Sequence, residues 1–164
     1  MKAKKLTALA VSVALSLILS FVESQIPPLV AIPGVKIGLA NTVSLFVLYS
    51  LGAPSAALVG VVRVSLSSLL FGTPVSFIYS ISGAMLSLLV MLLIKKLPFF
   101  SVIGVSVAGG VFHNIGQIIA AIIIMKSAAI AVYLPPLLVS GIIAGVAVGI
   151  VAGMVLKKLG KYIK

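Results

Sequence analysis

The chain has 164 residues, of which 62% are hydrophobic and only 8% are charged. A soluble domain needs roughly 25% charged residues to cover its surface, so the composition excludes most soluble folds and indicates an integral membrane protein. Twelve Lys and Arg residues stand against a single acidic residue, Glu23, which gives a net charge of +11. Six apolar segments, each approaching the roughly 20 residues that a helix needs to span a bilayer, account for most of the chain.

The first apolar segment covers residues 6–22 and is preceded by three lysines. No Ala-x-Ala-like site follows it, which favours a retained helix over a cleaved secretory signal. Three prolines and a glycine within residues 26–34 then interrupt any helix. This rigid loop, followed by the cation Lys36, is either a lid that closes over a bound substrate or a plain connector whose lysine reaches the lipid head groups.

The later apolar segments are separated by a Gly-Ala-Pro turn, a Gly-Thr-Pro turn, a Lys-Lys-Leu-Pro turn and residues 126–133. Because the loops between them are short, the sequence predicts an all-α integral membrane protein with a single six-helix transmembrane domain over residues 1–164. The expected spans cover residues 6–22, 36–51, 54–71, 74–94, 101–125 and 134–156.

The basic residues predict the orientation of these spans. If the N-terminus is cytoplasmic, nine of the twelve basic residues lie inside, Lys36 and Lys126 lie outside, and Arg63 lies within a span. This asymmetry agrees with the positive-inside rule, so both termini are expected in the cytoplasm. The protein is expected to be a multi-pass protein of the cell membrane, namely the bacterial cytoplasmic membrane. Because the lysines gather at the ends of apolar segments, no nucleic-acid-binding stripe is expected.

Small residues recur every fourth position on two segments, and such stripes let helices pack closely in lipid. The first segment has Ala10 and Ala14 in this spacing. Each stripe either packs inside the bundle or docks another membrane protein, and the first segment is the better candidate for docking. The sixth segment has Gly141, Gly145, Gly149 and Gly153.

Arg63 is expected near the middle of the membrane, where an Arg costs roughly 2.5–3.5 kcal/mol to insert. Two interpretations have equal weight. Arg63 either holds the bundle together, by binding helix-end carbonyls or Glu23, or it anchors an anionic group of a substrate, which its planar fork of donors suits.

A second polar cluster consists of His113, Asn114 and Gln117 in the fifth segment. His113 and Gln117 are four residues apart and therefore share one helix face. The cluster favours the lining of a binding pocket, and its neutral donors and acceptors suit a ring system or a polar head group. Asn41 and Tyr79 complete the predicted binding residues, although an interfacial anchor is the default role for such a tyrosine.

What the sequence lacks argues against catalysis. Without Asp there is neither an Asp pair for Mg²⁺ nor a Ser-His-Asp triad, and no P-loop is present for ATP hydrolysis. His113 alone is inadequate for a dedicated metal site. We therefore expect no catalytic residues, no cofactor and no metal.

Two strings in the sequence are specific enough to compare with known families. They read Pro33-Gly34-Val35-Lys36-Ile37-Gly38-Leu39-Ala40-Asn41 and His113-Asn114-Ile115-Gly116-Gln117. Both resemble the Gx transporter family, also labelled heptaprenyl diphosphate synthase component I, which is similar to the substrate-binding S components of energy-coupling-factor (ECF) transporters.

The resemblance implies a bundle of six helices that captures a small vitamin- or cofactor-precursor-like molecule from the exterior. It implies partners as well, a transmembrane coupling subunit and cytoplasmic ATPases, with association through Ala10 and Ala14. The synthase label implies instead a non-catalytic membrane accessory component of polyprenyl diphosphate or quinone biosynthesis. A weaker third hypothesis is a proton-linked carrier that uses His113 as a relay.

Overall fold

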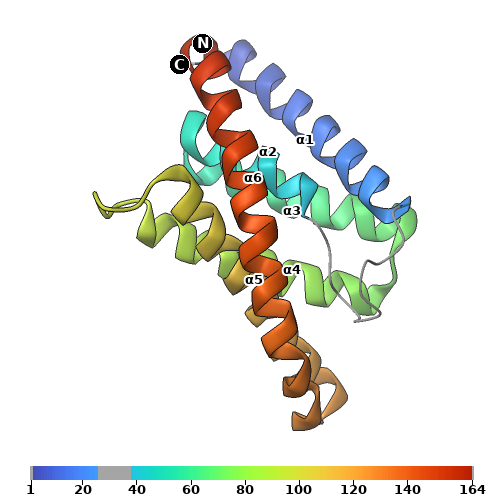
Figure 1. Cartoon of the computed structure of the whole chain (residues 1–164). Coiled ribbons are helices and arrows are strands. Elements are labelled where there is room, and N and C mark those ends of the chain that lie inside the picture. The colour runs from blue at the N-terminus through green and yellow to red at the C-terminus, as the bar shows by residue number, and fades with distance from the viewer. Residues whose placement is uncertain (1, 26–37, 164) are drawn as a thin grey trace.

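The computed structural model describes residues 2–25 and 38–163, so Lys36 and the predicted lid at residues 26–34 lie outside the described residues. Within the described ranges every regular element is a helix (Figure 1). This confirms the predicted all-α class. The elements are α1 (Lys2–Gln25), α2 (Leu39–Ser50), α3 (Ala53–Phe71), α4 (Pro74–Ile94), α5 (Val102–Met125), the 3₁₀ helix η1 (Ala128–Tyr133) and α6 (Leu134–Ile163).

The second helix is shorter than the sequence predicts. In the described residues, five helices are long and apolar enough to cross a membrane, but α2 has only 12 residues. At 1.5 Å per residue α2 extends about 18 Å, less than the roughly 30 Å hydrocarbon core. Gly38 and Gly52, which flank α2, have φ angles of 80° and 85° that other residues rarely adopt. The expected span at residues 36–51 is therefore wrong in length.

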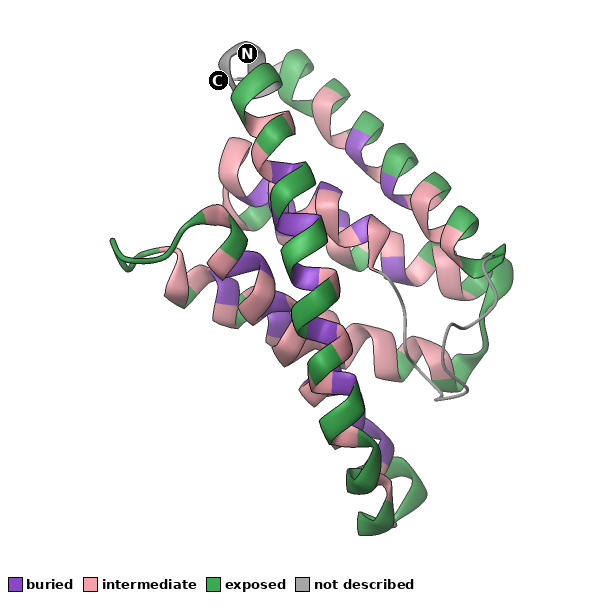
Figure 2. Cartoon of the chain, in the orientation of Figure 1, coloured by how far each residue is buried: buried purple, intermediate pink, exposed green. Residues whose placement is uncertain are grey.

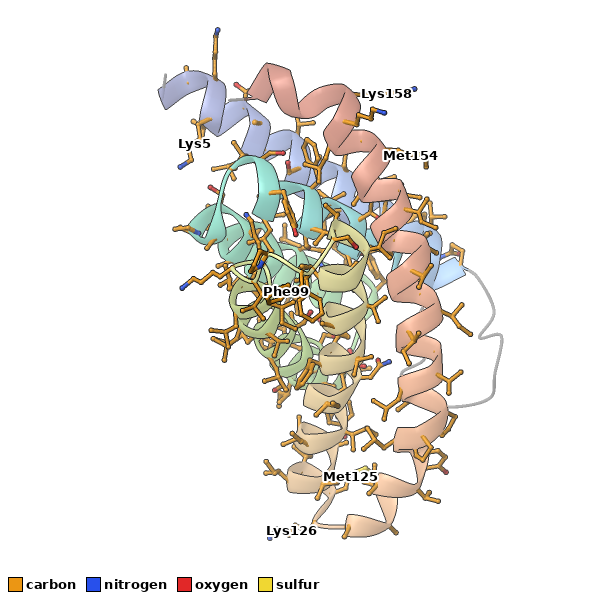
Figure 3. All side chains as sticks on the ribbon, turned by 60° about the vertical axis from the view of Figure 1, so that its left-hand side comes forward. Lys5, Phe99, Met125, Lys126, Met154 and Lys158 are labelled. Carbon is orange, nitrogen blue, oxygen red and sulfur yellow. The ribbon has the colours of Figure 1, made fainter. Side chains whose placement is uncertain are left out.

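The first turns of α1 and the last turns of α6 lie at the same end of the molecule (Figure 1). Figure 3 shows Lys5 and Lys158 at that end, and Met125 and Lys126 at the opposite end. This arrangement agrees with the predicted grouping of basic residues. That the shared end faces the cytoplasm stays a prediction.

The core is centred on α2, which packs against α1, α3 and α6. Leu45, Val47 and Leu48 of α2 are fully buried, together with Val59 of α3 and Val105 of α5. Figure 2 shows buried residues on the inner sides of the helices and exposed ones on the outer sides. Since the exposed residues are mainly large and apolar, the outer surface suits contact with lipid.

Glycines allow α5 and α6 to pack backbone to backbone. A Cβ atom added to Gly145 would lie 2.6 Å from Cα of Val107, and one added to Gly110 would lie 2.5 Å from the carbonyl oxygen of Gly141. By contrast, a Cβ on Gly153 would meet nothing within 4 Å. The predicted glycine stripe therefore packs inside the bundle over most of its length, and only Gly153 lies in open space.

Lys95 connects the turn after α4 to the end of α2. Its Nζ donates a hydrogen bond to the carbonyl oxygen of Leu48 over 2.8 Å and lies 4.4 Å from the ring centroid of Tyr49. A cation at this position stabilises the negative end of the α2 dipole. Lys95 thus has a structural role besides its predicted role in orientation.

Candidate functional site

The polar side chains of the bundle gather around Arg63 of α3 and His113 of α5. These two residues line three separate cavities, with volumes of about 70, 550 and 100 Å³. Because all three cavities share the same two side chains, we treat them as one site with a central chamber and two extensions. The central chamber also contacts Glu23, Gly38, Asn41, Ser87, Ser106 and Asn114.

Arg63 is incompletely satisfied by the protein. Its Nη2 donates a long hydrogen bond of 3.4 Å to Oδ1 of Asn41. Its Nε is buried and has no hydrogen-bond partner among the described residues. A buried donor without a partner costs free energy, so it marks a place where a ligand acceptor is favourable. The guanidinium is thus positioned to bind an anion inside the bundle.

Glu23 lines the chamber but is not bound to Arg63. Its Oε1 accepts a hydrogen bond from the backbone N–H of Gly38, which ties the end of α1 to the start of α2. No ion pair joins Glu23 to Arg63 in the described part of the chain. The two interpretations of Arg63 both stay predictions. The sequence predicted Glu23 as a possible partner of Arg63, and the structure places it in the chamber wall.

His113 and Gln117 lie where α4 and α5 cross closely. A Cβ on Gly83 of α4 would lie 3.1 Å from Cε1 of His113 and 2.9 Å from Cγ of Gln117. Gly83 therefore makes room for both side chains. Gln117 joins Arg63 and His113 in the cavity of about 100 Å³, whose other polar lining includes several serines. The predicted shared face of His113 and Gln117 is thus turned toward cavities.

Asn114 lines the central chamber, and its side-chain amide also connects two helices. The side chain is buried, and its Nδ2 donates a 2.6 Å hydrogen bond to the carbonyl oxygen of Leu137 in α6. A Cβ on Gly141 would come within 2.9 Å of the same Nδ2. Asn114 therefore holds α5 against α6, and its second N–H and its carbonyl oxygen have no partner among the described residues.

We expect Asn114→Leu to destabilise the protein by about 1–2 kcal/mol, because the carbonyl of Leu137 would lose its partner inside the bundle. Thermal unfolding in detergent, followed by circular dichroism, measures this loss. Gln117→Leu is the matched control, since no hydrogen bond of its side chain to α6 is present in the described structure. Equal unfolding temperatures for the two variants would contradict the structural role of Asn114.

The remaining predicted binding residues are Tyr79 and Lys36. Tyr79 of α4 is half-buried and lines none of the described cavities, and Lys36 lies outside the described residues. Conversely, Ser44 of α2 lines the cavity of about 550 Å³, and its buried Oγ has no partner among the described residues. The only sequence feature that could have predicted this position of Ser44 is its small polar side chain in an otherwise apolar helix. Ser87 of α4 also lines two of the cavities.

The side chains of the site are groups that can bind a ligand. It offers one guanidinium, one imidazole, one carboxylate and the amides of Asn41 and Gln117 on otherwise apolar helices. Among the described residues, no group of three His, Cys, Asp or Glu side chains could hold a metal ion. Such a set can neutralise one negative charge and orient a polar group by hydrogen bonds.

Comparison with known proteins places this site within a family. The family profile described as "Heptaprenyl diphosphate synthase component I" matches residues 12–155. The chain belongs to this family. The match includes every described residue of the site and confirms the resemblance seen in the sequence. No curated protein matches the chain.

The fold of this family member is similar to a solved structure described as "Structure and mechanism of the S component of a bacterial ECF transporter". The TM-score is 0.76, and the match covers 100% of this chain and 99% of the other at 19% sequence identity. The heptaprenyl diphosphate synthase component I family member therefore has the fold of an S component, as the sequence predicted.

Proposed function

We propose that the chain is the substrate-binding membrane subunit of an ECF-type transporter. The single observation that carries this proposal is the buried guanidinium of Arg63, whose Nε lacks a partner among the described residues, inside a chamber of an S-component fold. The substrate would be a small vitamin- or cofactor-precursor-like molecule with a negatively charged group, captured from the exterior. The near absence of acids in the chain supports an anionic substrate, because only Glu23 would repel it.

Each side chain of the site has a role in this proposal. Arg63 neutralises the anionic group, while Asn41, His113 and Gln117 orient the polar part of the molecule. Asn114 contributes its carbonyl oxygen or its second N–H, because one N–H already binds Leu137. Lys36 would add a second positive charge from the predicted lid. Tyr79 stays a predicted binding residue, although it lines none of the described cavities.

A subunit without a P-loop needs partners that hydrolyse ATP, and α1 is the surface that we propose for their coupling subunit. Ala10 and Ala14 are both exposed, and Leu6 and Ile18 beside them are 70% and 58% exposed. Figure 2 shows the exposed residues along the outer side of α1. Two alanines four residues apart allow another helix to approach closely. The buried Ser12 and Ser16 lie on the opposite, inner side.

We expect Ala14→Leu to reduce co-purification of a coupling subunit and its ATPases at least about tenfold, because a larger side chain keeps the two helices apart. The measurement is affinity purification from the native membrane with quantitative mass spectrometry. Ala147→Leu is the matched control, because Ala147 is exposed on α6, away from α1. Equal recovery of partners with both variants would contradict docking through α1.

The substrate itself is tested by gentle purification in lipid, followed by mass spectrometry of the small molecules retained. We expect one anionic molecule in stoichiometric amount. If no vitamin, flavin or quinone precursor binds the reconstituted protein with a Kd below about 1 mM, or −4.1 kcal/mol, the proposal fails.

The family description favours one alternative, a non-catalytic accessory component of polyprenyl diphosphate or quinone biosynthesis. The same purification separates the two proposals. Recovery of a soluble polyprenyl synthase, without ATPases, would favour the accessory role.

A further inference from the structure

The largest cavity in the described structure opens sideways between α3 and α4. Its volume of about 550 Å³ falls within the roughly 300–1,000 Å³ of small-molecule sites. On its rim, Val61, Met85 and Leu89 are 45%, 65% and 54% exposed. These side chains belong to the apolar outer surface of the bundle, so the mouth of this lateral groove faces the region where lipid chains lie.

Small residues keep the lateral groove open. Ala57 and Gly60 of α3 line it, as does Ala84 of α4. A Cβ on Gly60 would meet nothing within 4 Å, whereas one on Gly83 of the neighbouring α4 surface would lie 2.7 Å from the carbonyl oxygen of His113. Gly60 therefore does not serve close helix packing. Its lack of a side chain leaves space that no other described residue fills.

The inner end of the groove is polar. Arg63, His113 and Asn41 line both the groove and the central chamber. Two buried groups on the groove lining have no hydrogen-bond partner among the described residues, the Nε of Arg63 and the Oγ of Ser44. Both are donors that an anionic oxygen can accept from. A cation at the end of an apolar groove is complementary to an anion at the end of an apolar chain.

We infer that the site takes a single-chain amphiphile, whose one compact anionic group binds Arg63 and whose apolar chain lies in the lateral groove between α3 and α4. This inference rests on the proposed substrate-binding function and narrows its substrate class. The anionic group is compact in this inference, because the chamber beside Arg63 has a volume of only about 70 Å³. The apolar chain of the bound molecule reaches the outer surface of the bundle at the mouth between Val61 and Met85.

The test uses the full chain in phosphatidylcholine nanodiscs, with radiolabelled dodecyl phosphate and ethyl phosphate as probes and empty nanodiscs as the blank. Gly60→Leu places a side chain in the groove at a position where an added Cβ meets nothing within 4 Å. We expect it to weaken binding of dodecyl phosphate at least about tenfold more than binding of ethyl phosphate, because only the longer probe needs the groove. Gly153→Leu, the same change at another glycine in open space, should change neither affinity.

The other outcomes are distinguishable. Arg63→Gln could weaken the binding of both probes while Gly60→Leu changes their two affinities equally. In that case the proposed binding function stands, but the apolar chain does not lie in the groove and the inference is overturned. If neither probe binds, the inference is overturned, whereas the proposed binding function is decided separately by the small molecules that the purified protein retains. If dodecyl phosphate binds equally to wild type, Gly60→Leu and Arg63→Gln, the probe only partitions into lipid, and the inference is overturned.

A second measurement covers the case in which Gly60→Leu does not fold. A dodecyl phosphate analogue with a diazirine at the end of its chain should label peptides of α3 and α4 in the wild-type protein, and excess unlabelled dodecyl phosphate should prevent this. Labelling spread over the outer faces of α1 and α6 would overturn the inference.

Discussion

Arg63→Gln is expected to abolish retention of the anionic ligand while leaving the fold intact. Removing one partner of a buried, hydrogen-bonded charge pair costs about 2–5 kcal/mol, so the affinity should fall by about 100-fold. Insertion of the helix should become easier, since an Arg near the middle of a span costs roughly 2.5–3.5 kcal/mol. The unfolding temperature should therefore stay the same or rise. Ligand retention by mass spectrometry and thermal unfolding are measured on the same sample.

The two interpretations of Arg63 differ in the sign of this thermal change. If Arg63 holds the bundle together, its loss lowers the unfolding temperature together with binding. Lys126→Gln is the control for charge, because it removes one exposed cation at the far end of the molecule (Figure 3). Arg63→Lys tests the geometry of the donors, since a lysine keeps the charge but not the planar fork. We expect Arg63→Lys to bind more weakly than wild type and better than Arg63→Gln.

Gly145→Ala is expected to destabilise the bundle, although Gly→Ala usually stabilises a helix by up to about 1 kcal/mol. The added Cβ would lie 2.6 Å from Cα of Val107 and 3.0 Å from the carbonyl oxygen of Ser106. Both are backbone atoms, which cannot move aside unless α5 and α6 separate. Overpacking of this kind costs about 1–3 kcal/mol, and Gly145→Val should exceed that range. The unfolding temperature should fall by roughly 5 °C for Ala and more for Val.

Gly153→Ala and Gly153→Val are the matched controls on the same helix. Because a Cβ there meets nothing within 4 Å, only the helix propensity changes, and Gly153→Ala should leave the unfolding temperature unchanged or raise it. Thermal unfolding by circular dichroism in one detergent compares all four variants. A similar response at Gly145 and Gly153 would show that the contact between α5 and α6 does not limit stability.

The sequence located the long helices because their apolar length is a local property. The expected span at residues 74–94 coincides with α4, and the one at residues 101–125 begins one residue before α5. It overestimated α2, because Leu39–Ser50 is apolar enough to look like part of a span, whereas two glycines with positive φ limit the helix. It also foresaw close packing by the glycines of α6, since their spacing of four puts them on one face.

The binding residues were predicted less completely, because side chains meet through packing and not through spacing. Arg63, Asn41 and His113 do come together, from three helices. Asn114 lies beside His113 and close to Gln117 in the sequence. Its side-chain amide nevertheless donates a hydrogen bond to the carbonyl oxygen of Leu137, because α6 lies on that side of α5. Tyr79 remains outside the described cavities. No periodicity in the sequence indicates that Ser44 lies beside Arg63 in the lateral groove.

By itself the sequence determined that this is an apolar, helical membrane protein with one buried cation and almost no acids. Composition and hydropathy suffice for this, because a bilayer accepts only chains that are apolar and internally hydrogen-bonded. The tertiary structure decided which partners the polar groups have. It turned Glu23 toward Gly38, left the Nε of Arg63 without a partner among the described residues, and opened a groove beside Gly60. These three features depend on how α2, α3 and α4 are arranged in space. That arrangement follows from contacts between residues that are distant in the chain.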